Sequence, residues 1–206
     1  DVTVDVGYAF SIALVNRSVD GAASWPIASI RWPYAAMTQR EIAAPCSEWA
    51  YDLLFAGNMR SDGAGLYGAR AAFVFDVQRR LGAPRMRIVA PGGGDTNNRM
   101  LVADVAASAN AILGFARPEV PGWIDTRVFQ YPGAGGVLIH DDAGEFLAPG
   151  EHYLRFDRSD PDSVIRAVEQ AKAIGPAIRE QAFRHVQGAH TWVHRCEEAL
   201  TAFYGR

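Results

Sequence analysis

From residue 51 onward, short apolar runs alternate with segments of helical periodicity, and this alternation limits the chain to few architectures. The apolar runs have the length of strands and cover residues 52–57, 87–90, 111–115 and 137–139. Between the first two, apolar side chains recur at helical spacing from Leu66 to Leu81, and Gly82 ends the pattern. Strands and helices that alternate with short connections are typical of right-handed βαβ units. We therefore expect an α/β fold with a Rossmann-like parallel sheet flanked by helices.

The last third of the chain has the pattern of helices. Asp160 and Pro161 predict a helix start, because aspartate caps helices well and proline at the first helical position loses no hydrogen bond. Gly175 and Pro176 are expected to break this helix. We thus expect three helices, with apolar stripes at residues 164–171, at residues 178–186 and from about residue 191 onward.

The first fifty residues follow neither period. Tryptophan and proline punctuate them at Trp25, Pro26, Trp32, Pro33 and Pro45, which indicates a packed, irregular segment. We expect residues 1–50 to be an inter-domain linker or the remnant of an N-terminal domain, and residues 51–206 to form the Rossmann-like domain. The chain begins at Asp1 and not at Met, so we expect it to be a piece of a longer protein.

Composition excludes several classes of function. The 206 residues are 49% hydrophobic with a formal net charge of −3, which suits a globular domain and argues against nucleic acid as a partner. No apolar run approaches the roughly 20 residues of a transmembrane segment, and no signal peptide is visible. Cys46 and Cys196 lie far apart in the sequence, which favours free thiols in a reducing compartment. We expect a cytoplasmic protein.

One segment points to a chemistry. Residues 127–136, with the sequence RVFQYPGAGG, place an arginine before a cluster of glycines that opens directly onto a strand-like run. In an α/β sheet such an arrangement can expose N–H groups and a guanidinium beside the strand ends, where anionic ligands bind. The segment is neither a Walker loop nor a dinucleotide fingerprint. Taken alone, the segment therefore favours an ordinary helix-to-strand connection capped by glycine.

The context of this segment resembles a known family. The segment is similar to the Arg-x-Phe-Glu-x-Pro-Gly-Ala-Gly-Gly stretch of group-1 glycosyltransferases of the spore-maturation (CgeB-like) family. Residues 145–156, which lead from Glu145 to Phe156 through Pro149-Gly150-Glu151, resemble its Phe-x-x-Gly-x-Glu segment and the strand after it. Residues 190–195, with the sequence HTWVHR, resemble its terminal helix start. The resemblance extends from about Asp52 to the C-terminus.

The resemblance implies a bacterial glycosyltransferase of hexosyltransferase type with GT-B architecture, of which this chain is the C-terminal half. The implied partners are a nucleotide-sugar donor, an unidentified glycosyl acceptor and an N-terminal GT-B domain, and no metal or other cofactor is implied. By position, Arg127 would face the donor diphosphate or sugar. Backbone approach to the donor would use Gly133, Gly135 and Gly136, and the crevice at the end of the first strand would be lined by Gly57 and Asn58. No catalytic residue can be assigned.

The chain departs from the family pattern at Gln130, where the family has glutamate. That carboxylate would accept hydrogen bonds from the donor ribose, and glutamine offers only a neutral carbonyl oxygen, whose bonds are about half as strong. Weaker donor binding, another donor preference and a degenerate site all stay open. The alternative function is therefore a non-catalytic nucleotide-binding or interaction module that retains the GT-B fold.

Other polar clusters carry less weight. Residues 91–95, with the sequence PGGGD, fit a flexible connection better than a phosphate loop. Residues 140–142, with the sequence HDD, fit a solvated turn better than a metal site, and His190 with His194 fits a helix cap better than a zinc site because no cysteine pair accompanies them. A response-regulator domain is disfavoured, since no acidic pair closes the first strand.

Overall fold

The fold was analysed in a computed structural model, which describes residues 2–4, 12–14, 35–42, 44–57, 59, 66–89, 106–116 and 124–204. The larger elements along the chain are β1 (Val2–Val4), β2 (Ile12–Leu14), β3 (Leu53–Ala56), α1 (Leu66–Leu81), β4 (Met86–Val89), β5 (Ala111–Gly114), α3 (Arg127–Gly133), β6 (Leu138–His140), β7 (Leu154–Arg155), α4 (Pro161–Ala189) and α5 (Trp192–Tyr204). Short 3-10 helices cover Ser47–Trp49, Ala83–Arg85 and Gly144–Phe146.

The five strands β3 to β7 form one sheet in the order β4-β3-β5-β6-β7, and every neighbouring pair is parallel. Leu53 of the central strand β3 lies in register with Met86 of β4 and with Ala111 of β5. The order places β3 between the two strands that follow it in sequence. The chain therefore adds β4 on one side of β3 and then β5, β6 and β7 on the other side, so the strand order reverses at β3. The α/β fold expected from the sequence is confirmed.

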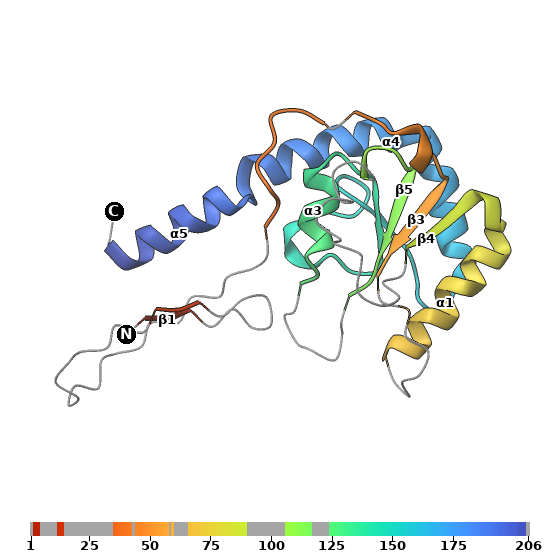
Figure 1. Cartoon of the computed structure of the whole chain (residues 1–206), viewed down its shortest axis with the longest axis horizontal. Coiled ribbons are helices and arrows are strands. Elements are labelled where there is room, and N and C mark those ends of the chain that lie inside the picture. Colours follow the sequence, from red (N-terminus) through yellow and green to blue (C-terminus); the bar gives the residue numbers. More distant parts are fainter. Residues whose placement is uncertain are drawn as a thin grey trace.

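Helices cover both faces of this sheet, as Figure 1 shows, with α1 and α3 on opposite sides and α4 running across both. Successive residues of a strand point to opposite faces, so Leu53 and Phe55 join the core beneath α1 and the first half of α4. Leu54 instead joins the second core, beneath α3 and the end of α4. This alternation explains why β5 and β6 are buried along their whole length and β3 at all but its last residue.

Helix α4 is a single helix of 29 residues that contains Pro176, so the expected break at Gly175-Pro176 is wrong. Proline removes one backbone hydrogen bond, and tertiary packing compensates for the loss here. Pro176 itself is exposed. Gly175 is buried, and a Cβ at this position would lie 3.5 Å from Val137 Cγ2. The apolar stripes predicted on either side of the break therefore form one continuous face against the domain.

The N-terminal fifty residues contain elements that the sequence did not predict. Strands β1 and β2 pair in antiparallel register, with Val2 opposite Leu14. Farther along, Ala36 is buried, its N–H donates to the His190 carbonyl at 2.8 Å, and its carbonyl accepts from Trp192 N–H at 3.0 Å. The residues around Ala36 thus pack onto the domain, while the four prolines and tryptophans from Trp25 to Pro33 lie outside the described residues. The domain boundary at residue 50 stays a prediction.

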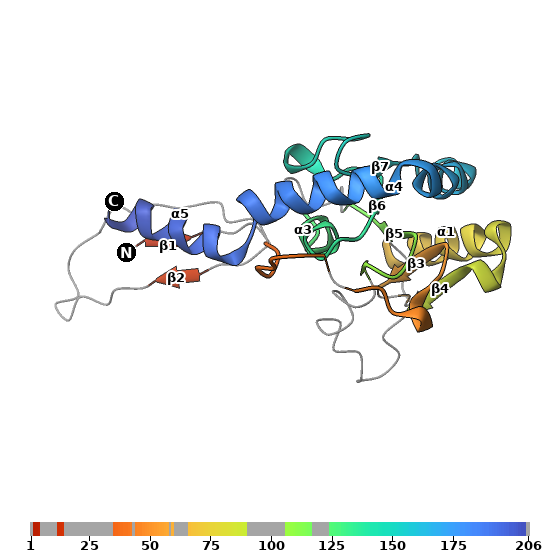
Figure 2. The ribbon, with the colours of Figure 1, turned by 90° about the horizontal axis from the view of Figure 1, so that it is seen from above.

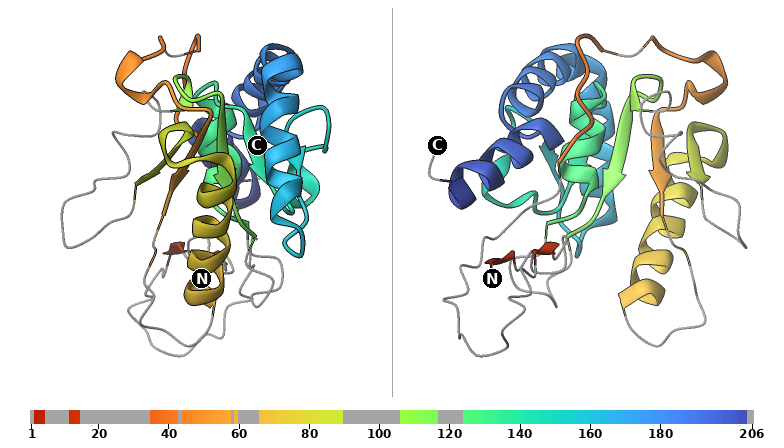
Figure 3. Two further views of the ribbon diagram at one scale, coloured as in Figure 1. Left: turned by 90° about the vertical axis from the view of Figure 1, so that its right-hand side faces the viewer. Right: turned by 60° about the vertical axis from the view of Figure 1, so that its left-hand side comes forward.

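Helix α5 leaves the domain where α4 ends. Figure 2 shows the two helices following one another with a break at residues 190–191, and α5 extends away from the sheet. Figure 3 (right) shows α5 on the side of the domain opposite to α1. At the break, the Thr191 hydroxyl hydrogen-bonds with His194 Nδ1 at 2.7 Å, and Arg195 Nη2 lies 2.8 Å from His190 Nδ1. His194 Nδ1 also accepts from the Thr191 N–H at 3.3 Å, so His194 caps the start of α5 as expected, whereas the His190 ring contacts the Arg195 side chain.

Candidate functional site

The side chain of Arg127 lies at the carboxyl edge of the parallel sheet. Arg127 is the first residue of α3, and its Nε donates to the carbonyl of Ala56, the last residue of β3, at 3.0 Å. Ligands of open α/β sheets bind outside the carboxyl ends of the strands, near the point where the strand order reverses. The guanidinium that the sequence singled out thus occupies the edge at which such a ligand is expected.

Asp125 holds this guanidinium in place. Its carboxylate accepts two hydrogen bonds from Arg127 Nη1, at 3.1 Å to Oδ1 and 2.9 Å to Oδ2, and a third from the Arg127 backbone N–H at 2.9 Å. The side chain of Asp125 is 4% exposed and that of Arg127 is 23% exposed. Asp125 was not among the residues predicted from the sequence. An aspartate two residues before a helix that opens with arginine was the available signal, because such a carboxylate can cap the helix and pair with the cation.

The pair changes the acid–base behaviour of the site. Burial disfavours the charged guanidinium, yet the Asp125 carboxylate more than offsets this effect, and the pKa of Arg127 is raised above its usual value. The buried phenol of Tyr131 is a further hydrogen-bond partner of the Arg127 side chain. Burial raises the pKa of Tyr131 despite the nearby cation. Arg127 is therefore charged and Tyr131 neutral across the physiological range.

Gln130 follows one turn later on α3 and is half-buried. Within the described part of the chain, no hydrogen bond to its side-chain amide is present. The amide is therefore available to a ligand, as the predicted ribose contact requires. Asn58, predicted beside Gly57 at the end of β3, lies outside the described residues.

The three glycines of the segment lie at the other end of α3, which corrects the expectation that they flank the ligand together with Arg127. Helix α3 connects the carboxyl end of β5 to the amino end of β6, so it begins at one edge of the sheet and ends at the other. Its rise of about 1.5 Å per residue separates Gly133 from Arg127 by roughly 9 Å along the axis. The glycines therefore face the amino edge of the sheet.

Neighbouring residues also cover these glycines. A Cβ on Gly136 would lie 2.8 Å from Ile112 Cδ1 and 2.9 Å from the Ala106 carbonyl oxygen. Gly133 packs in the same way against Ala36 and Val186, and Gly135 against Ile42. The glycines thus permit close backbone approach, as expected, but the group that approaches is the protein's own core. They are structural residues of the bend.

Gly57 does lie at the carboxyl edge. A Cβ there would meet the Phe55 ring at 2.8 Å and would lie 3.4 Å from Arg127 Nη2. A side chain at this position would therefore crowd the Phe55 ring and would lie in contact with the guanidinium. The structure therefore brings Gly57 and Arg127 to one edge of the domain, and Gln130 lies one turn farther along α3.

The neighbouring strand ends are tied together by an ion pair. Asp141, just after β6, pairs with Arg158 and accepts from the Ala116 N–H at 2.7 Å, and Arg158 also donates to the Ala116 carbonyl. His140 is fully buried, its Nδ1 accepts from the Asp142 N–H at 3.1 Å, and burial lowers its pKa. Residues 140–142 thus join the ends of β5 and β6. In the described ranges no group of three or more metal-ligating side chains gathers.

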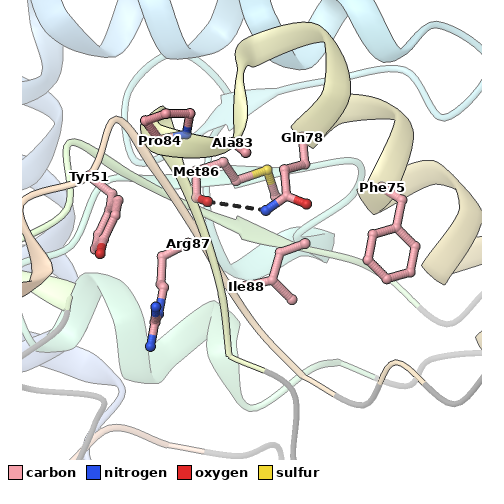
Figure 4. A pocket seen from close by; sticks show the side chains of 8 residues that line it. All are labelled: Tyr51, Phe75, Gln78, Ala83, Pro84, Met86, Arg87 and Ile88. Atoms are coloured by element: carbon pink, nitrogen blue, oxygen red, sulfur yellow. Dashed lines mark hydrogen bonds between the residues drawn. The ribbon is translucent and has the colours of Figure 1, made fainter.

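A hollow of about 460 Å³ lies elsewhere, along the outer side of the edge strand β4. Figure 4 shows Phe75, Arg87 and Ile88 around it, together with the hydrogen bond of 3.3 Å from Gln78 to the Met86 carbonyl. It is also lined by Tyr51 and Ala83-Pro84, which lie near the amino ends of β3 and β4. This hollow is separate from the edge at which Arg127 lies.

Comparison with known proteins identifies the family. A model described as "Glycosyl transferase-like" matches residues 66–201, well over half of the chain. The chain belongs to the glycosyl transferase-like family. The matched region runs from α1 to α5 and contains Arg127, Gln130 and the glycine bend. No curated protein matches the chain.

Solved structures of other proteins share this fold. The GtfA/B complex is similar with a TM-score of 0.54 at 12% identity, over 88% of this chain and 40% of that one. TarM is similar with a TM-score of 0.51 at 9% identity, over 85% of this chain and 39% of that one. The fold is therefore that of a GT-B glycosyltransferase domain, and the chain spans about two fifths of these larger proteins. None of the helices in the described ranges has the length and apolar character needed to cross a bilayer.

Proposed function

We propose that this member of the glycosyl transferase-like family is the donor-binding half of a hexosyltransferase-type GT-B enzyme. The family model and the shared fold support this function. The single observation that carries it is the guanidinium of Arg127, held against the end of β3 by Ala56 and Asp125. A coverage of 40% and 39% of the two similar structures also fits one half of a larger enzyme.

The proposed reaction moves a glycosyl group from a nucleoside-diphosphate sugar to an acceptor. The bond between the anomeric carbon and the diphosphate oxygen breaks, a bond to the acceptor's nucleophilic atom forms, and the nucleoside diphosphate leaves with the electron pair. Arg127 would donate to the donor, Gln130 would accept from its ribose, and Gly57 would line the crevice. No metal or other cofactor is expected, because fixed N–H donors and cations can offset charge on a leaving group.

We place the chain in the spore-maturation branch of the family on the motifs at residues 127–136, 145–156 and 190–195. A bacterial origin is part of this proposal. The proposed partners are an N-terminal GT-B domain and an unidentified acceptor. A cytoplasmic location is proposed as well, and the free thiols of Cys46 and Cys196 fit a reducing compartment.

A thermal-shift screen tests donor binding by the 206-residue chain. The panel contains uridine, guanosine, thymidine and adenosine diphosphates, each with and without an attached hexose. One nucleotide should raise the melting temperature at saturating concentration, because a ligand that binds only the folded state stabilises it. Isolated chain should transfer sugar poorly or not at all, since the opposite wall of a GT-B cleft belongs to the other domain. No shift across the whole panel would contradict the proposal.

A non-catalytic module that keeps the GT-B fold is the second candidate. The observation that favours it is the charge of the site, where Asp125 compensates Arg127 and Gln130 replaces a carboxylate. An interaction module that has lost the donor site would give no thermal shift with any nucleotide of the panel, whereas a nucleotide-binding module would respond to a nucleotide but transfer no sugar. Each would behave in this way even when joined to the N-terminal domain of the full-length protein.

A further inference from the structure

The guanidinium of Arg127 has few donors left for a ligand. A guanidinium carries five N–H groups, one on Nε and two on each terminal nitrogen. Ala56 takes the Nε–H at 3.0 Å, and the two oxygens of Asp125 take both N–H groups of Nη1 at 3.1 and 2.9 Å. The Tyr131 phenol is a further hydrogen-bond partner of this side chain, so the donor that remains for a ligand is on Nη2, which lies 3.4 Å from the Cβ position of Gly57.

This arrangement prevents both of the bidentate contacts that an arginine can make with an anion. A bidentate contact needs two parallel N–H groups, either from Nε with one terminal nitrogen or from the two terminal nitrogens together. Each of these pairs includes an N–H that Ala56 or Asp125 already holds. Arg127 can therefore offer a ligand only Nη2, in place of a bidentate grip.

The charge of Arg127 is compensated as well. The carboxylate of Asp125 is 4% exposed and lies 2.9 Å from Nη1, so the pair is close to neutral toward a ligand. A diphosphate that reaches Nη2 therefore also lies near the fixed negative charge of Asp125. In this poorly solvated position the carboxylate weakens the attraction that a lone guanidinium would exert.

We propose that Asp125 is a positioning residue that aims Nη2 of Arg127 at the donor crevice and limits Arg127 to a contact of low net charge. The assignment rests on the proposed function as far as the donor is concerned. The restraint on Arg127 can be tested without any ligand, so a failure of this restraint can be distinguished from a failure of the proposed function.

The ligand-free test is site-resolved labelling of the folded 206-residue chain with phenylglyoxal, which bridges two guanidinium nitrogens. The labelling rate at Arg127, followed by mass spectrometry, should rise about tenfold in Asp125→Ala, because the charge-assisted hydrogen bonds that restrain the guanidinium are lost. Asp125→Asn keeps an acceptor oxygen and should give an intermediate rate. Equal rates at Arg127 in the wild type and in Asp125→Ala would overturn the restraint.

Two controls guard against loss of folding. Asp141→Asn removes a carboxylate from an ion pair at the same sheet edge without contacting Arg127, and should leave the Arg127 rate unchanged. The buried Arg195 reports global opening, since its side chain is 3% exposed. If the labelling rate at Arg195 also rises in Asp125→Ala, that variant has opened globally and its Arg127 rate is not used. The restraint is then judged from Asp125→Asn, whose labelling rate at Arg127 must still exceed the wild-type rate.

The ligand test is calorimetric titration with the nucleoside diphosphate that gives the largest thermal shift. Asp125→Asn releases the compensating charge, so the diphosphate should bind about tenfold more tightly and with a steeper dependence on salt. Equal or weaker binding by Asp125→Asn would overturn the charge limit. If labelling behaves as expected but neither protein binds any nucleotide, the proposed function fails and the restraint on Arg127 stands.

Discussion

Ile42 occupies the space that a side chain on residue 135 would need. Gly135 adopts a φ of +86°, and the Ile42 side chain packs directly over its Cα. Glycine is therefore required at residue 135 for two reasons, the positive φ of its backbone and the contact with Ile42. The bend between α3 and β6 is part of the core and carries no ligand in this account.

Gly135→Ala is therefore expected to lower the free energy of unfolding by about 3 kcal/mol, the sum of a strained φ and an overpacked contact. The matched control is Gly150→Ala. Gly150 has a φ of +81° but no atom within 4 Å of its Cβ position, so only the backbone cost of about 1 kcal/mol applies. Urea unfolding measures both. Similar losses of unfolding free energy in the two variants would show that the Ile42 side chain moves aside without a loss of stability.

Removal of the guanidinium should leave a buried carboxylate without its cation. Arg127→Ala is expected to lower the free energy of unfolding by about 2 kcal/mol, because the Asp125 side chain is only 4% exposed and loses its ion-pair partner. The double variant Asp125→Ala with Arg127→Ala should recover part of that loss. A double-mutant cycle by urea unfolding gives the coupling. Additive losses would mean that the two side chains do not interact.

Gln130→Glu should tighten nucleotide binding several-fold, because a carboxylate makes charge-assisted bonds with ribose hydroxyls that the neutral amide cannot make. Calorimetric titration measures the change. Gln181→Glu, on the exposed face of α4, changes the net charge equally and should leave the affinity as it is. Unchanged affinity in Gln130→Glu would argue against a ribose contact at this position.

Acid should loosen the joint between α4 and α5. Burial, together with Arg195 at 2.8 Å, lowers the pKa of His190 from 6.5 to about 4. The unfolded chain therefore binds a proton at this residue before the folded chain does. Stability contributed by neutral His190 is complete above about pH 6.5 and is lost as the pH falls toward 4.

His190→Gln should consequently reduce the loss of stability between pH 7.5 and pH 5 by about 1 kcal/mol, a figure that allows for the half-exposed position of the ring. Urea unfolding at the two pH values measures it. Burial also lowers the pKa values of His140 and His152, so some acid sensitivity should persist. An unaltered dependence in His190→Gln would exclude His190 as a source.

The strands and α1 could be predicted from sequence because burial dictates them locally. Leu53 to Ala56 are apolar on both faces, which only a central strand of a parallel sheet requires. The run of α4 through Pro176 could not be predicted, since it depends on packing that local propensity does not contain. Arg127 and the glycines lie at opposite ends of α3, so the direction of this helix places them at opposite edges of the sheet. A short sequence motif does not reveal that direction. Asp125 was missed for a related reason, because its importance lies in the distance to Arg127.

The most direct measurement of the central claim is a ¹⁵N–¹H titration of the assigned chain with the best-binding nucleoside diphosphate. The account predicts that the largest amide shifts occur at Gly57, Arg127 and Gln130, at the carboxyl edge of the sheet, with little change at Gly135 and Gly136. Shifts centred on Gly135 and Gly136, or none at any residue at saturating nucleotide, would contradict it.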